Sequence, residues 1–253
     1  MPTMNFVPYN SGLEMKTEYL TREAAYFLGN IYSSGESVIQ KGTLYWVAPT
    51  RYNYGYANEL EIEEHFEFVK RMSSAMRAPT LMAENVRGTS LDSGKFRLPG
   101  FGTFFKSTGL TDLNDAIPSL RIALDNSPWS VKQAFMVGVF DGRGSIDVNK
   151  ATKAIRYIVL DCPTNEIGAF LYKFFEDNGF SCNYNESRDR KEGGTPRKPQ
   201  LRIKNNEAFM SRIGFISPKR FSLIHAAYQH THNYVQINDG SDVLPGLKTI
   251  TVR

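Results

Sequence analysis

The chain has 253 residues, of which 41% are hydrophobic, 13% aromatic and 22% charged. This composition supplies enough apolar side chains for a packed core, so an intrinsically disordered or fibrous protein is excluded. No apolar run approaches the roughly 18 residues of a membrane span, and the first residues lack the pattern of a secretion signal. We therefore expect no membrane partner and a location in the cytoplasm or an organellar matrix.

The net charge of +4 is unevenly distributed along the chain. Residues 18–126 carry 11 basic and 13 acidic side chains, whereas residues 127–236 carry 16 basic and 10 acidic ones. This asymmetry favours a polyanionic partner such as nucleic acid, although lysines on a solvated face would give the same count. The two cysteines, Cys162 and Cys182, form no CxxC motif, and we expect them to be buried thiols.

An internal repeat divides the chain. Residues 24–37 (AAYFLGNIYSSGES) match residues 133–146 (QAFMVGVFDGRGSI), and both segments place two glycines six residues apart after an apolar run. Two further pairs of segments follow at offsets that shrink only from 109 to 107 to 105 residues. A duplicated unit of about a hundred residues explains this regularity.

The repeat predicts an α+β fold of two pseudo-symmetric αββαββα units. We expect an N-terminal extension, a first repeat, a linker, a second repeat and a C-terminal tail, over residues 1–17, 18–117, 118–128, 129–236 and 237–253. In the first repeat, helical spacing and β-branched runs predict helices at 21–35 and 61–76, with strands at 37–47, 52–56, 80–86 and 95–105. In the second, they predict helices at 130–143, 165–178 and from 205, with strands at 145–149 and 154–161 and a hairpin over 181–203.

Each repeat begins with a helix that carries a glycine in its middle, Gly29 or Gly138. Such a glycine costs a helix about 1 kcal/mol relative to alanine, so a close approach of another backbone is the simplest reason for it. We expect these two helices to pack against each other and to end side by side. The alternative is that each helix belongs only to the core of its own repeat.

These segments resemble the paired motifs of the single-chain LAGLIDADG homing endonucleases. Residues 135–145 (FMVGVFDGRGS) are similar to the second motif, and residues 27–37 (FLGNIYSSGES) to a more degenerate first one. The flanking segments 127–132 and 209–220 are also similar to segments of that family, and the resemblance covers about residues 21–234. It implies a monomer whose two sheets form a saddle over the major groove of double-stranded DNA.

The resemblance also implies an acidic metal ligand just before the last glycine of each motif, where this sequence has Ser34 and Arg143. Serine is a weak ligand and arginine repels a cation, whereas Mg²⁺ needs carboxylate oxygens. We keep Glu36, Asp141 and Asp147 as substitute catalytic ligands; the alternative is that they cap helices or face solvent. The expected cofactor is Mg²⁺ if the protein is catalytic, and none otherwise.

Candidate DNA contacts occur in both repeats. The second repeat has a cation-rich hairpin, and the first has a segment that mixes aromatic with hydrogen-bonding residues; a solvated turn is the alternative for the hairpin. The candidates are Lys41, Arg51, Asn53, Arg188, Arg190, Lys191, Arg197, Lys198, Arg202 and Lys204.

Three functions are compatible with these features. The first is a sequence-specific double-stranded DNA-binding protein of the homing endonuclease type, whose cleavage activity is weakened, lost or transferred to relocated carboxylates. The second is an active site-specific DNA endonuclease, of the homing or restriction type. The third is an RNA-binding protein that assists splicing.

Overall fold

The computed structural model describes residues 22–34, 38–40, 43–47, 95–98, 113–152, 154–187 and 197–215. The first part of the chain contributes α1 (Arg22–Ser34), β1 (Val38–Gln40), β2 (Thr43–Val47) and β3 (Lys95–Leu98). The second part contributes α5 (Ile117–Asp125), α6 (Trp129–Arg143), β4 (Gly144–Val148), β5 (Ile155–Asp161), α7 (Asn165–Asp177), β6 (Cys182–Asn185), β7 (Gln200–Ile203) and α8 (Asn206–Arg212). Among these helices, none combines the length and apolar character that a membrane span requires.

The strands form two antiparallel sheets, so the predicted α+β class is confirmed. The first sheet has the order β1-β2-β3, and the second has the order β4-β5-β7-β6. The first hairpin of each sheet follows a helix in the chain: β1 and β2 follow α1, and β4 and β5 follow α6. The second strand of each hairpin pairs with a strand from much later in the chain, β2 with β3 and β5 with β7. The predicted elements at 52–56, 61–76 and 80–86 lie outside the described residues, and pseudo-symmetry stays a prediction.

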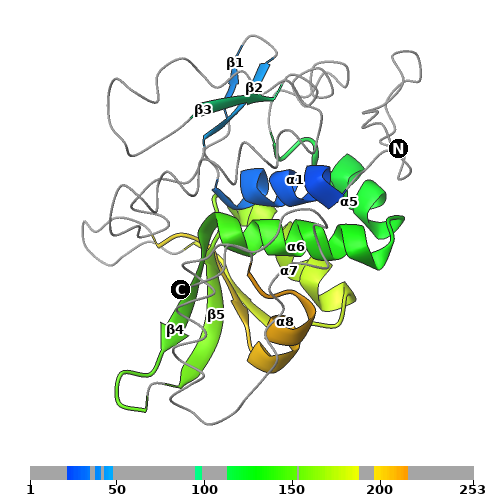
Figure 1. The fold of residues 1–253 in the computed structure, drawn as a ribbon. Helices are drawn as coiled ribbons and strands as arrows, with labels where there is room; N and C mark the ends of the chain where they lie inside the picture. The colour runs from blue at the N-terminus through cyan, green and yellow to red at the C-terminus, as the bar shows by residue number, and fades with distance from the viewer. Residues whose placement is uncertain are drawn as a thin grey trace, which may run out of the picture.

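Helices α1 and α6 lie side by side in the middle of the molecule (Figure 1). Their backbones are so close that neither Gly29 nor Gly138 has room for a side chain. A Cβ at Gly29 would overlap the carbonyl oxygen of Phe135 and lie 2.7 Å from the amide nitrogen of Val139. A Cβ at Gly138 would overlap the carbonyl oxygen of Tyr26. The two glycines therefore fix how closely the helices approach each other.

Phenylalanine side chains connect α6 to the helices that cover the second sheet. The ring of Phe135 meets Phe174 of α7 edge to face at 5.4 Å between centroids. Phe140, five residues further along α6, meets Phe175 at 5.4 Å and Phe209 of α8 at 4.7 Å. All five side chains are fully buried, and such edge-to-face pairs add to the stabilisation from burial. Helix α6 is thus held in the core on one side and against α1 on the other.

The helices of the second repeat begin at side chains that cap their free amides. The hydroxyl of Thr164 accepts a hydrogen bond from the amide of Ile167 at the start of α7. Asn205 does the same for Ala208 at the start of α8. Such caps stabilise a helix by about 1 kcal/mol each. They explain why α7 and α8 begin within one or two residues of the predicted positions.

Helix α5 was not predicted, because the segment 118–128 was expected to be only a linker. Pro118 lies in the first turn of α5, where a missing backbone N–H costs nothing, and Pro128 immediately precedes α6. Leu120 and Leu124 of α5 are buried in the core. The prolines therefore mark the beginnings of two helices and do not indicate irregular chain.

Both cysteines are free and buried, as the sequence indicates. Burial raises the pKa of the Cys162 thiol and of the Cys182 thiol to about 12 each. Neither thiol is therefore a nucleophile near neutral pH.

We expect Gly138→Ala to destabilise the protein, because the new methyl group would have to displace the backbone of Tyr26. Helix propensity alone predicts the opposite sign, a gain of about 1 kcal/mol. Overpacking of this kind costs roughly 1–3 kcal/mol, and each kcal/mol shifts the midpoint of thermal unfolding by about 2–4 °C in a chain of this size. Lys132→Ala on the same helix is the control, and an unfolding midpoint above that of the unmodified protein would contradict the close contact.

Candidate nucleic-acid interface

The C-terminal ends of α1 and α6 meet at small residues. A Cβ at Gly142 would overlap the hydroxyl of Ser33, and both residues are buried. Ser34 and Arg143, the last residues of the two helices, directly follow this contact. The two positions where the sequence resemblance implies metal ligands are therefore neighbours across the helix pair.

Each of these helix ends carries partial negative charge from its free carbonyl groups. Arg143 places a guanidinium in the last turn of α6, where a cation is favourable. This positive group occupies the helix end at which a divalent cation would have to bind. Because like charges repel, Arg143 makes this helix end less favourable for a divalent cation than a carboxylate would.

Asp141 is completely buried between the two helices, and its Oδ2 accepts a hydrogen bond of 2.9 Å from the hydroxyl of Tyr26 on α1. The sequence predicts Asp141 as a substitute catalytic ligand. Its position argues against that role, because a metal ion or a phosphate cannot reach a carboxyl group without exposed surface. Asp141 instead joins α6 to α1.

Asp147 lies on β4, and its Oδ1 is 2.7 Å from Nη2 of Arg156 on β5. It is partly exposed, but it stands four residues beyond the end of α6 and forms an ion pair. Glu36, the third substitute ligand, lies outside the described residues. Within the described ranges no group of three histidine, cysteine or acidic residues could hold a metal ion. The described residues therefore do not fit a Mg²⁺ site.

The second sheet has one apolar face and one polar face. Ile146, Ile158, Ile203 and Cys182 form a cross-strand row on the face that packs in the core. The neighbouring row, displaced by one residue in every strand, points to the opposite face because side chains alternate along a strand. It consists of Ser145, Val159, Arg202 and Asn183.

Further polar side chains share this polar face with Arg202. Asp147 and Tyr157 are cross-strand partners on it, as are Asp161, Gln200 and Asn185. Of this set, the sequence analysis named only Asp147 and Arg202. The alternation of side chains along each strand would have placed the other residues on this face, but only if the pairing register of the strands had been known. The sequence does not give that register. Hydrogen-bonding groups on an extended sheet face suit contacts with base edges in a major groove.

Three other predicted contact residues lie at the ends of β7. Arg197 and Lys198 precede this strand and Lys204 follows it, and all three are exposed. The remaining candidates, Lys41, Arg51, Asn53, Arg188, Arg190 and Lys191, lie outside the described residues. The structure thus brings four of the predicted cations to one strand and its ends.

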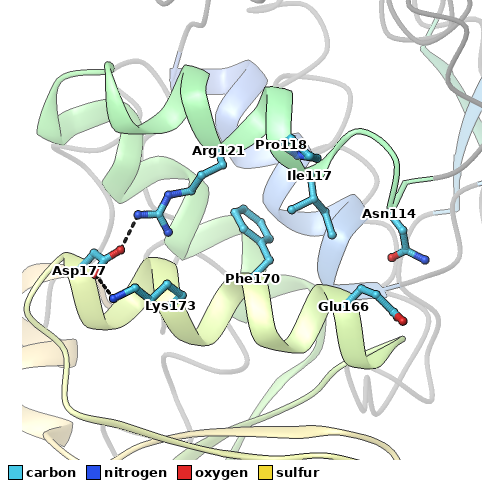
Figure 2. A pocket seen from close by; sticks show the side chains of 8 residues that line it. All are labelled: Asn114, Ile117, Pro118, Arg121, Glu166, Phe170, Lys173 and Asp177. Carbon is cyan, nitrogen blue, oxygen red and sulfur yellow. Dashed lines mark hydrogen bonds and ion pairs between the residues drawn. The ribbon is translucent and has the colours of Figure 1, made fainter.

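A groove of about 560 Å³ lies between α5 and α7, with Phe170 at its floor (Figure 2). Its cations are already paired with an acid: Nη2 of Arg121 lies 2.5 Å from Asp177, and Nζ of Lys173 lies 2.8 Å from it. Hydrogen bonds from Lys173 and Arg121 lower the pKa of Asp177 below its usual value. The groove therefore offers no uncompensated positive charge to a nucleic acid and contains none of the predicted contact residues.

Comparison with solved structures identifies the fold. The structure of I-DmoI in complex with DNA and Ca is 14% identical, with a TM-score of 0.51 over 81% of this chain and 97% of that chain. I-DmoI in complex with DNA and Mn, also 14% identical, gives a TM-score of 0.49 over 76% of this chain and 96% of that one. The homing endonuclease I-WcaI bound to its DNA recognition sequence is 15% identical, with a TM-score of 0.40 over 86% and 87%. The sequence matches no protein-family model and no curated protein.

The chain has the homing endonuclease fold, on the strength of the match to the DNA- and Ca-bound I-DmoI structure. The fold that the sequence resemblance implied is thereby confirmed. At 14% identity the match concerns the fold, and the chemistry of the site has to come from this chain's own residues.

We expect Tyr26→Phe to lower the free energy of unfolding by about 1–3 kcal/mol, because Asp141 loses a buried hydrogen-bond donor. The matched control is Tyr32→Phe, in which a buried hydroxyl that donates to the backbone carbonyl of Leu113 at 2.8 Å is removed from the same helix. A neutral bond of that kind is worth about 0.5–1.5 kcal/mol. Chemical denaturation of both variants measures the difference, and a Tyr26→Phe protein as stable as the original would contradict a structural role for Asp141.

Proposed function

We propose that this protein binds double-stranded DNA sequence-specifically in the manner of a homing endonuclease, with its cleavage activity weakened or lost. The observation that carries the proposal is the pairing of the homing endonuclease fold with Ser34 and Arg143 at the two adjoining helix ends. The fold supplies a sheet face for the major groove, while the helix ends lack the carboxylates that hydrolysis with Mg²⁺ needs.

Arg143 has a direct function in this proposal. Divalent ions assist phosphodiester chemistry by neutralising charge on the phosphate, and a guanidinium can supply the same neutralisation through two parallel hydrogen bonds. With the arginine at the end of α6, the protein clamps the phosphates of bound DNA without a metal ion. Positive charge at this site also disfavours binding of a divalent cation.

The partner is inferred from two sources. The I-DmoI structure with the significant fold match is a complex with DNA and Ca. In this chain, the polar sheet face carries Arg202, and Arg197, Lys198 and Lys204 flank the same strand. We therefore favour double-stranded DNA over RNA, bound by one copy of the chain, with a divalent ion required only if Glu36 replaces the missing ligands.

Incubation with a randomised double-stranded DNA pool and Mg²⁺ or Mn²⁺, followed by sequencing of bound and cut molecules, tests the proposal. We expect enrichment of a DNA motif with little or no cutting. The matched variant carries both Ser34→Asp and Arg143→Asp, which restores an acid at each helix end. It should bind divalent ions and nick the enriched DNA, at some loss of metal-free affinity.

Two results would contradict the proposal. Efficient Mg²⁺-dependent cutting by the unmodified protein that disappears in Glu36→Gln would mean that the active site has moved and still works. Enrichment from a randomised RNA pool, with none from double-stranded DNA, would instead favour the splicing function.

A further inference from the structure

Arg202 occupies an inner strand of the second sheet, on the polar face. Its strand, β7, lies between β5 and β6, and its cross-strand neighbours are Val159 and Asn183. A side chain at this place is surrounded by sheet on both sides, unlike the exposed cations Arg197 and Lys198 before the strand. It is half-buried, so its stem is restricted by packing while its head remains accessible.

A chain of hydrogen bonds orients the guanidinium of Arg202. Its Nε donates to Oε1 of Gln200 at 2.6 Å, and Nε2 of Gln200 donates to Oδ1 of Asp161 at 2.9 Å. The carboxylate of Asp161 can only accept hydrogen bonds, so the NH₂ group of the Gln200 amide must face Asp161. The amide oxygen of Gln200 is then left to face Arg202. The guanidinium carbon of Arg202 also lies over the ring of Tyr157, 5.7 Å from the ring centroid, in a cation–π contact.

This arrangement holds the arginine through Nε alone and not through its terminal nitrogens. Among the described residues, Arg202 forms no ion pair, and its hydrogen bond to Gln200 uses Nε. Its two terminal nitrogens, Nη1 and Nη2, donate to no residue of the described ranges and lie at the polar face. The partner that holds it is a neutral amide, so the positive charge of Arg202 is retained for a ligand. By contrast, Arg156 on the neighbouring strand is paired with a carboxylate.

We infer that Arg202 is a base-recognising residue that selects a guanine in the major groove, with Gln200 and Asp161 as its positioning residues. The two terminal nitrogens of an arginine match O6 and N7 of guanine, and a pair of this kind discriminates against other bases by roughly 5- to 150-fold in affinity. Restriction of the side chain before binding reduces the entropy lost on contact. The inference rests on the proposed DNA-binding function and deepens it.

Selection from a randomised double-stranded DNA pool in EDTA, with the full chain, tests the inference. The unmodified protein should enrich a motif with one guanine that is lost in Arg202→Gln, while the rest of the motif persists. Gln200→Met keeps the side chain neutral and of similar length but removes the acceptor for Nε, so it should weaken the preference for guanine at that same position. Lys198→Ala is the control, and it should weaken binding to all sequences equally and lower the salt dependence by about one unit of log–log slope.

A second measurement removes the acceptor on the DNA instead of the donor on the protein. Replacing the selected guanine by 7-deazaguanine should weaken binding of the unmodified protein and have little effect on Arg202→Gln. An unchanged motif in Arg202→Gln, or equal sensitivity of both proteins to 7-deazaguanine, would overturn the inference while leaving DNA binding intact. Failure of the unmodified protein to enrich any DNA would instead overturn the proposed function and the inference with it.

Discussion

The close contact between α1 and α6 is the constraint on which the arrangement of the described helices and sheets depends. Helices normally pack with side chains between them, but here Gly29 and Gly138 let the backbones touch, and Gly142 extends the contact to the helix ends. Each helix leads directly into a hairpin of its own sheet. The spacing of the two helices therefore sets how far apart the helix ends at Ser34 and Arg143 lie.

The tight packing of α1 against α6 also decides whether an acidic side chain on α6 has a structural role or can reach a ligand. A carboxyl group between two tightly packed helices must be hydrogen-bonded, and Asp141 meets that requirement through Tyr26. A carboxyl group at the helix ends would face a ligand, but that place in α6 has Arg143. In the proposed function, the charge of this last helical residue decides whether the helix end favours a metal ion or a phosphate.

Local sequence patterns predicted much of the fold and less of the site. Helical spacing, the glycine pairs and β-branched runs located α1, α6, β4, β5 and α7 to within a residue or two, because these signals act over a few positions. The burial of Asp141 depends on Tyr26, which is 115 residues away in the sequence. A pattern of neighbouring residues cannot predict a contact over that separation. The orientation of Arg202 by Gln200 and Asp161 depends on the register of β5 against β7, which only tertiary packing sets. Helix α5 replaces the predicted linker because Pro118 lies in the first turn of a helix, where a missing backbone N–H costs nothing.

The central claim is our proposal that the guanidinium of Arg143 takes the place of a divalent cation at the phosphates of bound DNA. The most direct measurement is the dissociation constant for a selected double-stranded DNA in EDTA and in Mg²⁺, at matched ionic strength. If the guanidinium takes the place of the metal ion, the dissociation constant for DNA should be the same in EDTA and in Mg²⁺. The DNA should also stay intact after prolonged incubation in Mg²⁺. A complex that tightens markedly in Mg²⁺, or DNA cut on both strands only in its presence, would contradict the claim.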